Sequence, residues 1–483
     1  EQTLLTLFPQ ERPVYPDTPP GGDNELVLSF SRGSQWCTAR AVLRRGGKPY
    51  VRQCRVAAAE LPAEDPVVST RLTRRTLQRA FYLAAVDCLG TEPPWGMLSG
   101  VRPVKLPTRA MEAGASPRQA EAMLRDQYRV SPLRRQLAMD CAQASLAVKR
   151  DLKPQEISLY VGIPFCPTRC AYCSFVSQSV ERSFSLVEPY VKALIAEIRS
   201  GGDMVRSNRL RPRAFYMGGG TPGILTPDQM DAILTALEES FDLSACPEIT
   251  VEIGRPDTIT AEKLAVLKSH GVTRVCVNPQ TMEDHVLAAI GRRHVSADTV
   301  RAMELVRAYR FPHVNMDLIA GLPEDTPEGF RRSLDKCLEL GADDITIHTL
   351  ALKKGSRILM EGLSIPDGAA VQAMLDYAAP TLRAAGFVPY YLYRQKYMSG
   401  SFENVGWSRP GGECWYNVDI MSELCSILSF GAGGSTKMVE PGTNHIERVF
   451  NLKYPKEYTE RPEKIQQNQA AFVEFYQKYV PET

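Results

Sequence analysis

The sequence lacks the features that would assign it to a membrane, a secretory route or a nucleic acid. No uninterrupted apolar run reaches the roughly 18 residues of a membrane span, so we expect no membrane contact. The first residues lack the basic start and the small-residue cleavage site of a signal peptide, so we expect a cytoplasmic protein. The net charge is only +2, because 57 basic residues oppose 55 acidic ones, so no overall field favours nucleic acid.

The twelve cysteines also lack the regular spacing of a disulfide framework, which favours a reducing compartment. Three of them are the exception. Cys166, Cys170 and Cys173 follow a short apolar run at C-x3-C-x2-C spacing. A loop of this size lets three thiolates converge on one small inorganic centre.

Three thiolates on one loop favour an iron–sulfur cluster. Such clusters are normally held by four thiolates, so three ligands on a four-iron cluster would leave one iron open to bind a substrate. A structural zinc site needs a fourth ligand and usually paired C-x2-C units, and no second pair lies downstream. Zinc and a purely structural role are the alternatives.

At 483 residues the chain is longer than one average domain, and its composition divides it into three parts. Residues 1–150 show paired strands around a Gly46–Gly47 turn and a helix at 73–89, which predicts a separate N-terminal accessory α+β domain. Residues 156–360 form a regular core. We expect residues 361–483 to be a domain that caps the substrate site.

The core alternates apolar strands with amphipathic helices. A capping box at Thr226 opens one helix, and Gly341 is expected to end another. Six strand–helix units predict an α/β fold with a parallel sheet curved into a partial (β/α)6 barrel. The chemistry of such folds lies at the carboxyl ends of the strands, which is where the cysteine loop falls. Six strands are predicted, at 157–163, 214–217, 249–253, 274–278, 314–319 and 345–350.

Ligand-type residues follow several of these strands. Glycines 218–220 let a backbone approach a ligand closely, and Glu252 can accept hydrogen bonds from a ribose diol. Arg292 can clamp a carboxylate through two hydrogen bonds. Asp317 lies in an apolar strand, where an unpaired charge is costly, so we expect it to have a partner or a function. Each residue alone fits turn geometry or a surface ion pair, but their shared position favours a ligand site.

These residues resemble the radical S-adenosylmethionine (SAM) superfamily, and within it the oxygen-independent coproporphyrinogen III oxidase (coproporphyrinogen dehydrogenase) family, over about 156–355 and less closely over 360–440. The resemblance implies a 4Fe-4S cluster held by Cys166, Cys170 and Cys173, with SAM chelating the open iron. It implies that Tyr160, Gly219 and Glu252 contact this SAM and that Tyr172 packs against the site. The family also holds a second SAM, so we expect one or two; the residues matching its contacts are Gly220, Thr221, Gln280, Arg292, Asp317 and Ala351.

The chain differs from the better-known oxidases at two positions. Phe175 stands where they carry another cysteine, and Gly162 where they carry a histidine. Residues 390–396 and 403–407 look most like a divergent branch found in anaerobic Gram-positive bacteria. The haem-chaperone relatives use a His-Asn pair ahead of Tyr-Trp, whereas residues 411–417 contain no histidine, which counts against a chaperone.

The resemblance implies an oxidoreductase of haem biosynthesis that converts coproporphyrinogen III to protoporphyrinogen IX by decarboxylating two propionates. Propionates require cations, for which Arg394, Lys396 and Lys353 are candidates, and Tyr391 and Tyr393 can stack on the macrocycle. A low-potential electron donor such as flavodoxin or ferredoxin is implied, and we expect a monomer. The alternatives are a haem-trafficking protein that retains the cluster and a radical SAM enzyme acting on haem.

Overall fold

The computed structural model describes residues 2–8, 11, 13–15, 22–62, 64–173, 177–244, 246–352, 356–395 and 402–480. The chain divides into two compact units, residues 1–139 and 140–483. The boundary falls inside helix α5 (Pro132–Arg150).

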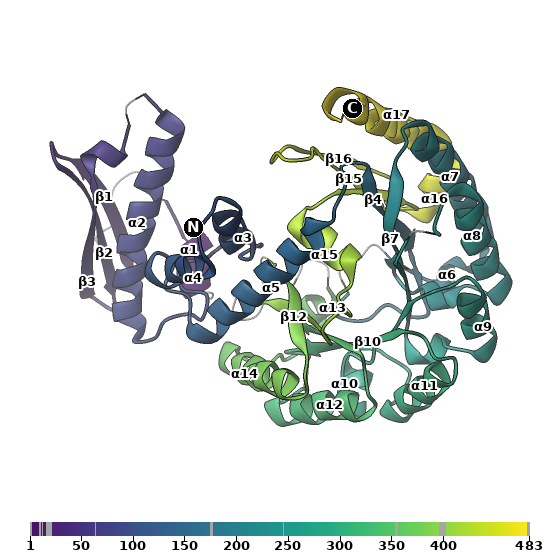
Figure 1. The fold of residues 1–483 in the computed structure, drawn as a ribbon. Coiled ribbons are helices and arrows are strands. Elements are labelled where there is room, and N and C mark those ends of the chain that lie inside the picture. The colour runs from purple at the N-terminus through teal and green to yellow at the C-terminus, as the bar shows by residue number, and fades with distance from the viewer. Residues whose placement is uncertain are drawn as a thin grey trace. The chain divides into compact units, whose positions relative to one another are not determined.

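The first unit is built on an antiparallel sheet in the order β1–β2–β3, with the predicted Gly46–Gly47 turn between β2 and β3 (Figure 1). Helix α2 (Pro66–Leu89) packs on one face of this sheet and starts well before residue 73, where the sequence placed it. The earlier start follows from Pro66 at the first helical position and from Asp65, whose carboxylate accepts two backbone N–H groups. The other elements are α1 (Gln2–Leu7), β1 (Glu25–Arg32), β2 (Trp36–Arg45), β3 (Lys48–Ala57), η1 (Ala58–Glu60), α3 (Lys105–Glu112) and α4 (Pro117–Asp126).

The second unit contains the predicted barrel. All six predicted strands are present and parallel, in the order β11–β10–β9–β8–β7–β4 within a larger sheet. The partial (β/α)6 fold predicted from the sequence is therefore confirmed. The strands are β4 (Glu156–Ile163), β7 (Arg211–Gly219), β8 (Glu248–Gly254), β9 (Arg274–Val277), β10 (His313–Ala320) and β11 (Asp344–Thr349).

The C-terminal part of the chain extends this sheet at both edges. Strand β13 (Asn404–Ser408) pairs antiparallel with β11, and β12 (Val388–Tyr393) pairs antiparallel with β13 at the outer edge. At the other edge β14 (Ser426–Phe430) adds parallel to β4 as a strand that the sequence did not predict. Strands β15 (Ser435–Val439) and β16 (Ile446–Phe450) complete a sheet of 11 strands.

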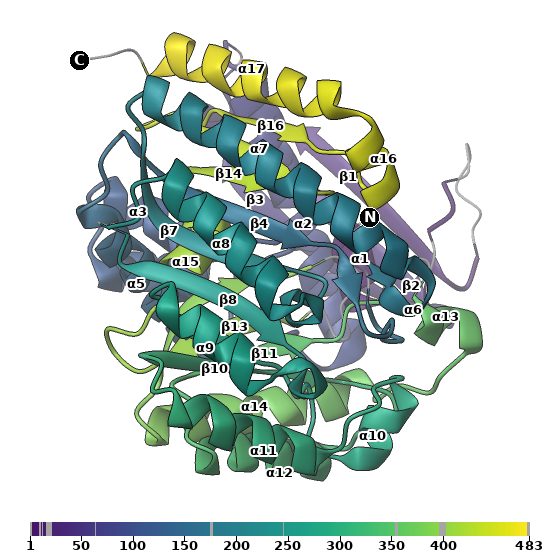
Figure 2. The ribbon, with the colours of Figure 1, turned by 90° about the vertical axis from the view of Figure 1, so that its right-hand side faces the viewer.

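Helices cover the outer face of the curved sheet (Figures 1 and 2). The Thr226 capping box and the left-handed Gly341 are both confirmed. The larger outer helices are α7 (Val187–Ser207), α8 (Pro227–Ser240), α9 (Ala261–Ser269), α11 (Ser296–Ala308), α12 (Pro327–Glu339), α14 (Gly368–Ala384) and α17 (Pro462–Tyr479). Shorter elements are β5 (Phe165–Cys166), β6 (Gln178–Ser179), α6 (Val180–Ser183), η2 (Phe184–Leu186), η3 (Pro222–Ile224), η4 (Pro256–Thr258), α10 (Asp284–Ala289), α13 (Arg357–Glu361), α15 (Trp415–Ser422) and α16 (Pro455–Glu460).

Helix α15 is anchored at the amino ends of the barrel strands. Glu248, the first residue of β8, accepts hydrogen bonds from the backbone N–H groups of Trp415 (2.5 Å) and Tyr416 (3.2 Å). A carboxylate at a helix N-terminus satisfies its free donors and complements its dipole. Arg274, the first residue of β9, forms a buried ion pair with Asp344. This end of the barrel is therefore occupied by structural contacts, opposite the carboxyl ends where the cysteine loop lies.

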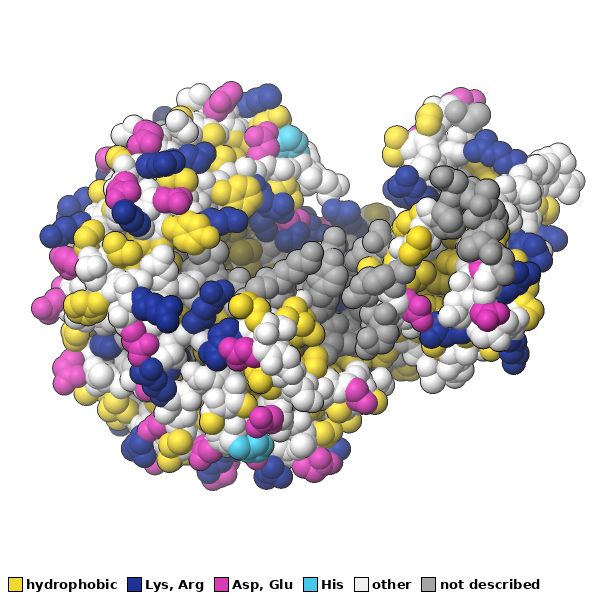
Figure 3. Space-filling view, turned by 180° about the vertical axis from the view of Figure 1, so that it is seen from behind, with side chains coloured by type: hydrophobic (Ala, Val, Ile, Leu, Met, Phe, Trp, Pro, Cys, Tyr) yellow, Lys and Arg dark blue, Asp and Glu magenta, His cyan; other side chains and the backbone are white. Residues whose placement is uncertain are grey.

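Acidic and basic side chains are interspersed over the visible face of the larger unit (left in Figure 3), in line with the small net charge. None of the described helices combines the length and the apolar character that crossing a membrane requires.

Candidate active site

The cysteine loop follows β4 at the carboxyl end of the sheet. Cys166 ends the short strand β5 and is buried, whereas Cys170 and Cys173 are half-buried. The Thr221 hydroxyl donates to Cys166 Sγ at 3.5 Å, so the loop after β7 contacts the first thiol. Burial raises the pKa of the Cys166 thiol, and the Thr221 hydrogen bond opposes this rise. Within the described ranges, no three His, Cys, Asp or Glu side chains lie close enough to hold a single metal ion.

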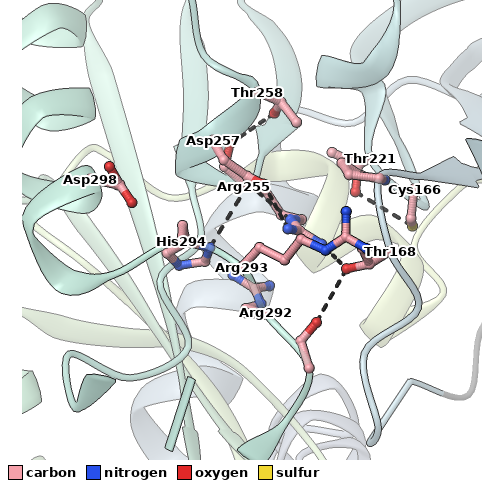
Figure 4. Close-up of polar contacts among 12 residues, drawn as sticks. Cys166, Thr168, Thr221, Arg255, Asp257, Thr258, Arg292, Arg293, His294 and Asp298 are labelled. Carbon is pink, nitrogen blue, oxygen red and sulfur yellow. Dashed lines mark hydrogen bonds and ion pairs between the residues drawn. The ribbon is translucent and has the colours of Figure 1, made fainter. Parts of the chain in front are cut away.

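Hydrogen bonds from two other segments, the chain after β8 and the chain after α10, hold this loop in place. Thr168 is central, because its hydroxyl accepts from Arg255 (2.6 Å) and donates to the Gly291 carbonyl (3.2 Å). Arg255 is buried and forms two further hydrogen bonds to the Asp257 carboxylate, at 2.9 and 2.7 Å (Figure 4). The Ala171 N–H donates to the Ile290 carbonyl at 3.0 Å. Neither Arg255 nor Thr168 was predicted from the sequence.

The glycines after β7 let the backbone pass close to the first thiol. A Cβ atom on Gly220 would lie 2.9 Å from Cys166 Sγ and 2.5 Å from the Phe165 carbonyl oxygen. Gly219 has a φ of 110°, a conformation that only glycine adopts without strain. A Cβ on Gly218 would lie 2.9 Å from Glu252 Oε2. The missing side chains therefore leave room for the thiol on one side and for Glu252 on the other.

Aromatic and acidic side chains line the inside of the barrel. The rings of Tyr160 and Tyr216 stack 6.4 Å apart, and Tyr416 of α15 stacks on both, at 5.9 and 4.6 Å. The Tyr216 hydroxyl donates to Glu252. Burial, aided by the negative charge of Asp317, raises the pKa of Glu252 to about 7.

Asp317 has partners inside the barrel, as its place in an apolar strand predicted. Asn315 donates to its carboxylate at 2.8 Å, and His348 Nε2 lies 3.6 Å from Asp317 Oδ2. Burial alone would raise the pKa of Asp317, but the hydrogen bond and charge of His348 lower it. Burial opposes the charge on His348, yet Asp317 raises the pKa of the imidazole. His348, at the end of β11, was missed by the sequence analysis; its signal was a single histidine in an apolar strand.

A second group of polar residues lies beside the cysteine loop. Arg292 is buried, donates to the Asn278 and Pro279 carbonyls, and donates to the Tyr172 hydroxyl at 3.2 Å. Gln280 has a φ of 71°, and its backbone pairs with β10 through the Asp317 carbonyl (2.9 Å). Non-glycine residues in this conformation are strained and concentrate at functional sites.

Three side-chain atoms of this group are buried without a hydrogen-bond partner. They are Asn278 Oδ1, Gln280 Oε1 and Arg292 Nε. Buried polar atoms are normally paired, so orphaned ones point to an additional binding partner. Together with three thiols on one loop and the glycine space beside Cys166, they fit a thiolate-bound cluster and a polar ligand next to it. Ala351, which follows β11, is half-buried.

The comparisons with known proteins agree with this arrangement. The model of the radical SAM superfamily matches residues 160–337. An "oxygen-independent coproporphyrinogen-III oxidase-like protein HemZ" from Bacillus subtilis (strain 168) is 37% identical over 80% of this chain and 78% of its own length. The chain belongs to the radical SAM superfamily, in the oxygen-independent coproporphyrinogen-III oxidase-like family. Radical SAM proteins use a 4Fe-4S cluster and SAM, so these are its cofactors.

The chain is also similar to a second relative by sequence and to one solved structure. The "heme chaperone HemW" of Mycobacterium tuberculosis (strain H37Rv) is 29% identical over 63% of this chain and 74% of its own length. The solved structure of coproporphyrinogen III oxidase (HemN) from Escherichia coli has a TM-score of 0.53 at 22% identity, covering 68% of this chain and 73% of that one. This structural likeness supports the fold and leaves the substrate open.

The contact between Glu252 and SAM that the family resemblance implies, combined with the raised pKa of Glu252, predicts pH-dependent SAM binding. Below about pH 7 the carboxyl is protonated and accepts hydrogen bonds less strongly, so SAM affinity should fall about tenfold between pH 8 and pH 6. Equilibrium dialysis with the reconstituted protein measures this. The Glu252→Gln variant should bind more weakly than wild type at pH 8 and show no such pH dependence.

The same shift affects stability. A carboxyl whose folded-state pKa is raised contributes stability at low pH that is lost as the pH rises through about 7. Glu252→Gln should therefore have a higher melting temperature than wild type, and the difference between the two should grow from pH 6 to pH 8. Glu239→Gln, at an exposed glutamate of α8, is the control and should show no such trend.

For the SAM-binding experiment, equal pH dependence in wild type and Glu252→Gln would contradict the assignment of Glu252 as a SAM contact.

Proposed function

We propose that the protein catalyses the oxygen-independent oxidative decarboxylation of coproporphyrinogen III to protoporphyrinogen IX in the cytoplasm. One observation carries the proposal: the cysteine loop lies beside the orphaned polar atoms of Asn278, Gln280 and Arg292 at the carboxyl end of the barrel. Similarity over 80% of the chain to a protein described as coproporphyrinogen-III oxidase-like supports this substrate class.

The residues of the candidate site have separate roles in the proposal. Cys166, Cys170 and Cys173 hold the cluster. When bound, the cluster and SAM supply the one-electron chemistry that removes a hydrogen atom from the substrate.

Arg292 and Gln280 offer a charged donor and an amide acceptor to the polar groups of SAM. Glu252 accepts hydrogen bonds from its hydroxyl or amino groups. His348 and Asn315 keep Asp317 ionised and oriented inside the barrel. Asp317 contacts the second SAM in this proposal, so two SAM molecules should bind per chain, which equilibrium dialysis measures.

Arg394 is the candidate cation for the propionates of the substrate. It follows β12 and is buried. Burial lowers the pKa of Arg394 to about 10, which still leaves it charged at neutral pH and able to pair with a propionate. Tyr391 lies over Gly406, where an added Cβ would be 1.8 Å from its ring, so it packs within the sheet. Tyr393 is half-buried, and its ring is nearly parallel to that of Tyr391, so it is the better candidate for stacking on the macrocycle. Lys353 and Lys396 lie outside the described residues.

A haem-trafficking role is the second candidate, because several relatives are described as haem chaperones. The position of residues 411–417 speaks against haem binding by this segment. The Gly412 carbonyl accepts from Arg274, and Cys414 Sγ lies 3.2 Å from Glu248 Oε1, so the segment anchors α15 at the amino ends of the strands.

An anaerobic turnover assay tests the proposal. The reconstituted protein is incubated with a chemical reductant, SAM and coproporphyrinogen III, and the products are identified by mass spectrometry. The expected result is 5′-deoxyadenosine whose formation depends on the porphyrinogen, together with loss of two carboxyl groups from it. Tight haem binding with no SAM turnover would favour the chaperone. Deoxyadenosine without change in the porphyrinogen would overturn the substrate assignment and leave the radical chemistry.

A further inference from the structure

Three segments surround the cysteine loop on its outer side. Strand β6 pairs with β5 at Cys166 and leads into α6. The chain after α10 accepts hydrogen bonds from the loop through the carbonyls of Ile290 and Gly291. Helix α13 follows on, since the Ile358 N–H donates to the Ala171 carbonyl at 3.4 Å. Figure 2 shows α6, α10 and α13 along the same end of the barrel.

Each of these segments and the loop itself carry an exposed arginine. They are Arg169 of the loop, Arg182 of α6, Arg293 after α10 and Arg357 of α13. Arg293 pairs with Glu181 and Arg357 with Glu361, both at 2.7 Å, on the surface. Glu181, Glu361 and the exposed Asp284 of α10 leave the four arginines in slight excess, so these segments carry a small net positive charge.

Large apolar side chains are also exposed on these segments. In the described part of residues 140–483, six large hydrophobic side chains are exposed, and four of them lie here: Phe184 (79%), Val295 (43%), Leu359 (50%) and Met360 (75%). Solvent-exposed apolar side chains that gather in one place mark interaction surfaces, and interfaces combine such groups with a charged rim. We call these four apolar residues and four arginines the cluster-loop face.

We propose that the cluster-loop face docks an acidic one-electron carrier protein. This inference rests on the proposed function, in which the cluster must receive an electron from outside the chain. One electron passes from the reduced carrier to the cluster, and no covalent bond is made or broken. A carrier seated here lies against the loop that bears Cys166, Cys170 and Cys173. The positive rim suits a negative partner, and a small, salt-sensitive contact suits a transient redox complex.

The test is the binding of a bacterial flavodoxin to the reconstituted full-length protein at low and high salt. Arg182→Glu/Arg357→Glu reverses two charges of the rim, and it should weaken flavodoxin binding about tenfold or more at low salt and reduce the salt dependence. Met360→Asp removes an apolar side chain and leaves all four arginines in place. It should weaken flavodoxin binding as well.

The control is Arg40→Glu/Arg55→Glu in the first unit. These exposed arginines lie on β2 and β3. Residues 1–139 contain 20 Lys and Arg against 13 Asp and Glu, so an acidic protein has a competing basic surface there. The control should bind flavodoxin as wild type does. Weaker binding in the control with normal binding in Arg182→Glu/Arg357→Glu, or equal binding in all three proteins, would overturn the inference.

A second readout separates this inference from the proposed function. With a chemical reductant, Arg182→Glu/Arg357→Glu should form 5′-deoxyadenosine at the wild-type rate, whereas with reduced flavodoxin its rate should fall about tenfold. Equal rates with flavodoxin would overturn the docking inference alone. Absence of turnover in every protein with the chemical reductant would overturn the proposed function, while the binding measurement would still decide the docking site.

Discussion

Cys170→Ala is expected to lose the iron–sulfur cluster and all SAM cleavage. The three cysteines share one loop, and the loss of one leaves only two thiolates for a centre that already lacks a fourth. Activity should fall by more than the ~10²-fold that loss of an outer partner of a metal ligand can cost, because here a ligand itself is removed. Iron and sulfide analysis together with 5′-deoxyadenosine formation measures both effects.

The matched control is Cys88→Ala, which removes a half-buried thiol from α2 in the first unit. This variant should retain the iron content and the rate of wild type. The circular dichroism and melting temperature of Cys170→Ala should show that the barrel is still folded. Wild-type iron content in Cys170→Ala would contradict the assignment of this loop as the cluster ligand set.

Gly220→Ala is expected to have the second largest effect. Its new Cβ would lie 2.5 Å from the Phe165 carbonyl oxygen, 2.9 Å from the Ile163 carbonyl oxygen and 2.9 Å from Cys166 Sγ. Two of these neighbours are backbone atoms that cannot rotate away, so the loop must move, at a cost of about 1–3 kcal/mol in the free energy of unfolding. The displaced Cys166 thiol should lower cluster occupancy after reconstitution and SAM affinity with it.

Gly100→Ala is the control, because a Cβ there meets no atom within 4 Å. The urea unfolding curve and the iron content of Gly100→Ala should match those of wild type. If Gly220→Ala unfolds and takes up iron as wild type does, the close approach between the β7 loop and the cysteine loop is not required.

The sequence was sufficient for the elements that local pattern determines. The six parallel strands and the Thr226 cap follow from apolar runs and capping chemistry within a few residues of each other. Strand β14 was missed because it pairs with β4, some 270 residues earlier in the chain, and no local pattern reports that pairing. Residues 66–72 of α2, about two turns, were missed because the apolar positions used for the prediction begin later than the Asp65 cap.

The site divides in the same way. The cysteine loop and the glycines could be identified from spacing, and the presence of a partner for Asp317 from the cost of burying its charge. The partner itself, His348, comes from a different strand. Arg255 looked like an ordinary loop cation, and its role in holding Thr168 depends on a side-chain contact between residues 87 positions apart. Such contacts exist only once the barrel has brought the strand ends together.

The central claim is that the three thiols hold one cluster whose open iron binds SAM. Electron paramagnetic resonance of the reduced, reconstituted protein tests it most directly, with spectra recorded before and after SAM is added. The prediction is the signal of a single reduced 4Fe-4S cluster that changes shape on addition of SAM and is absent in Cys170→Ala. A signal that SAM leaves unchanged, although dialysis shows SAM to be bound, would contradict the account.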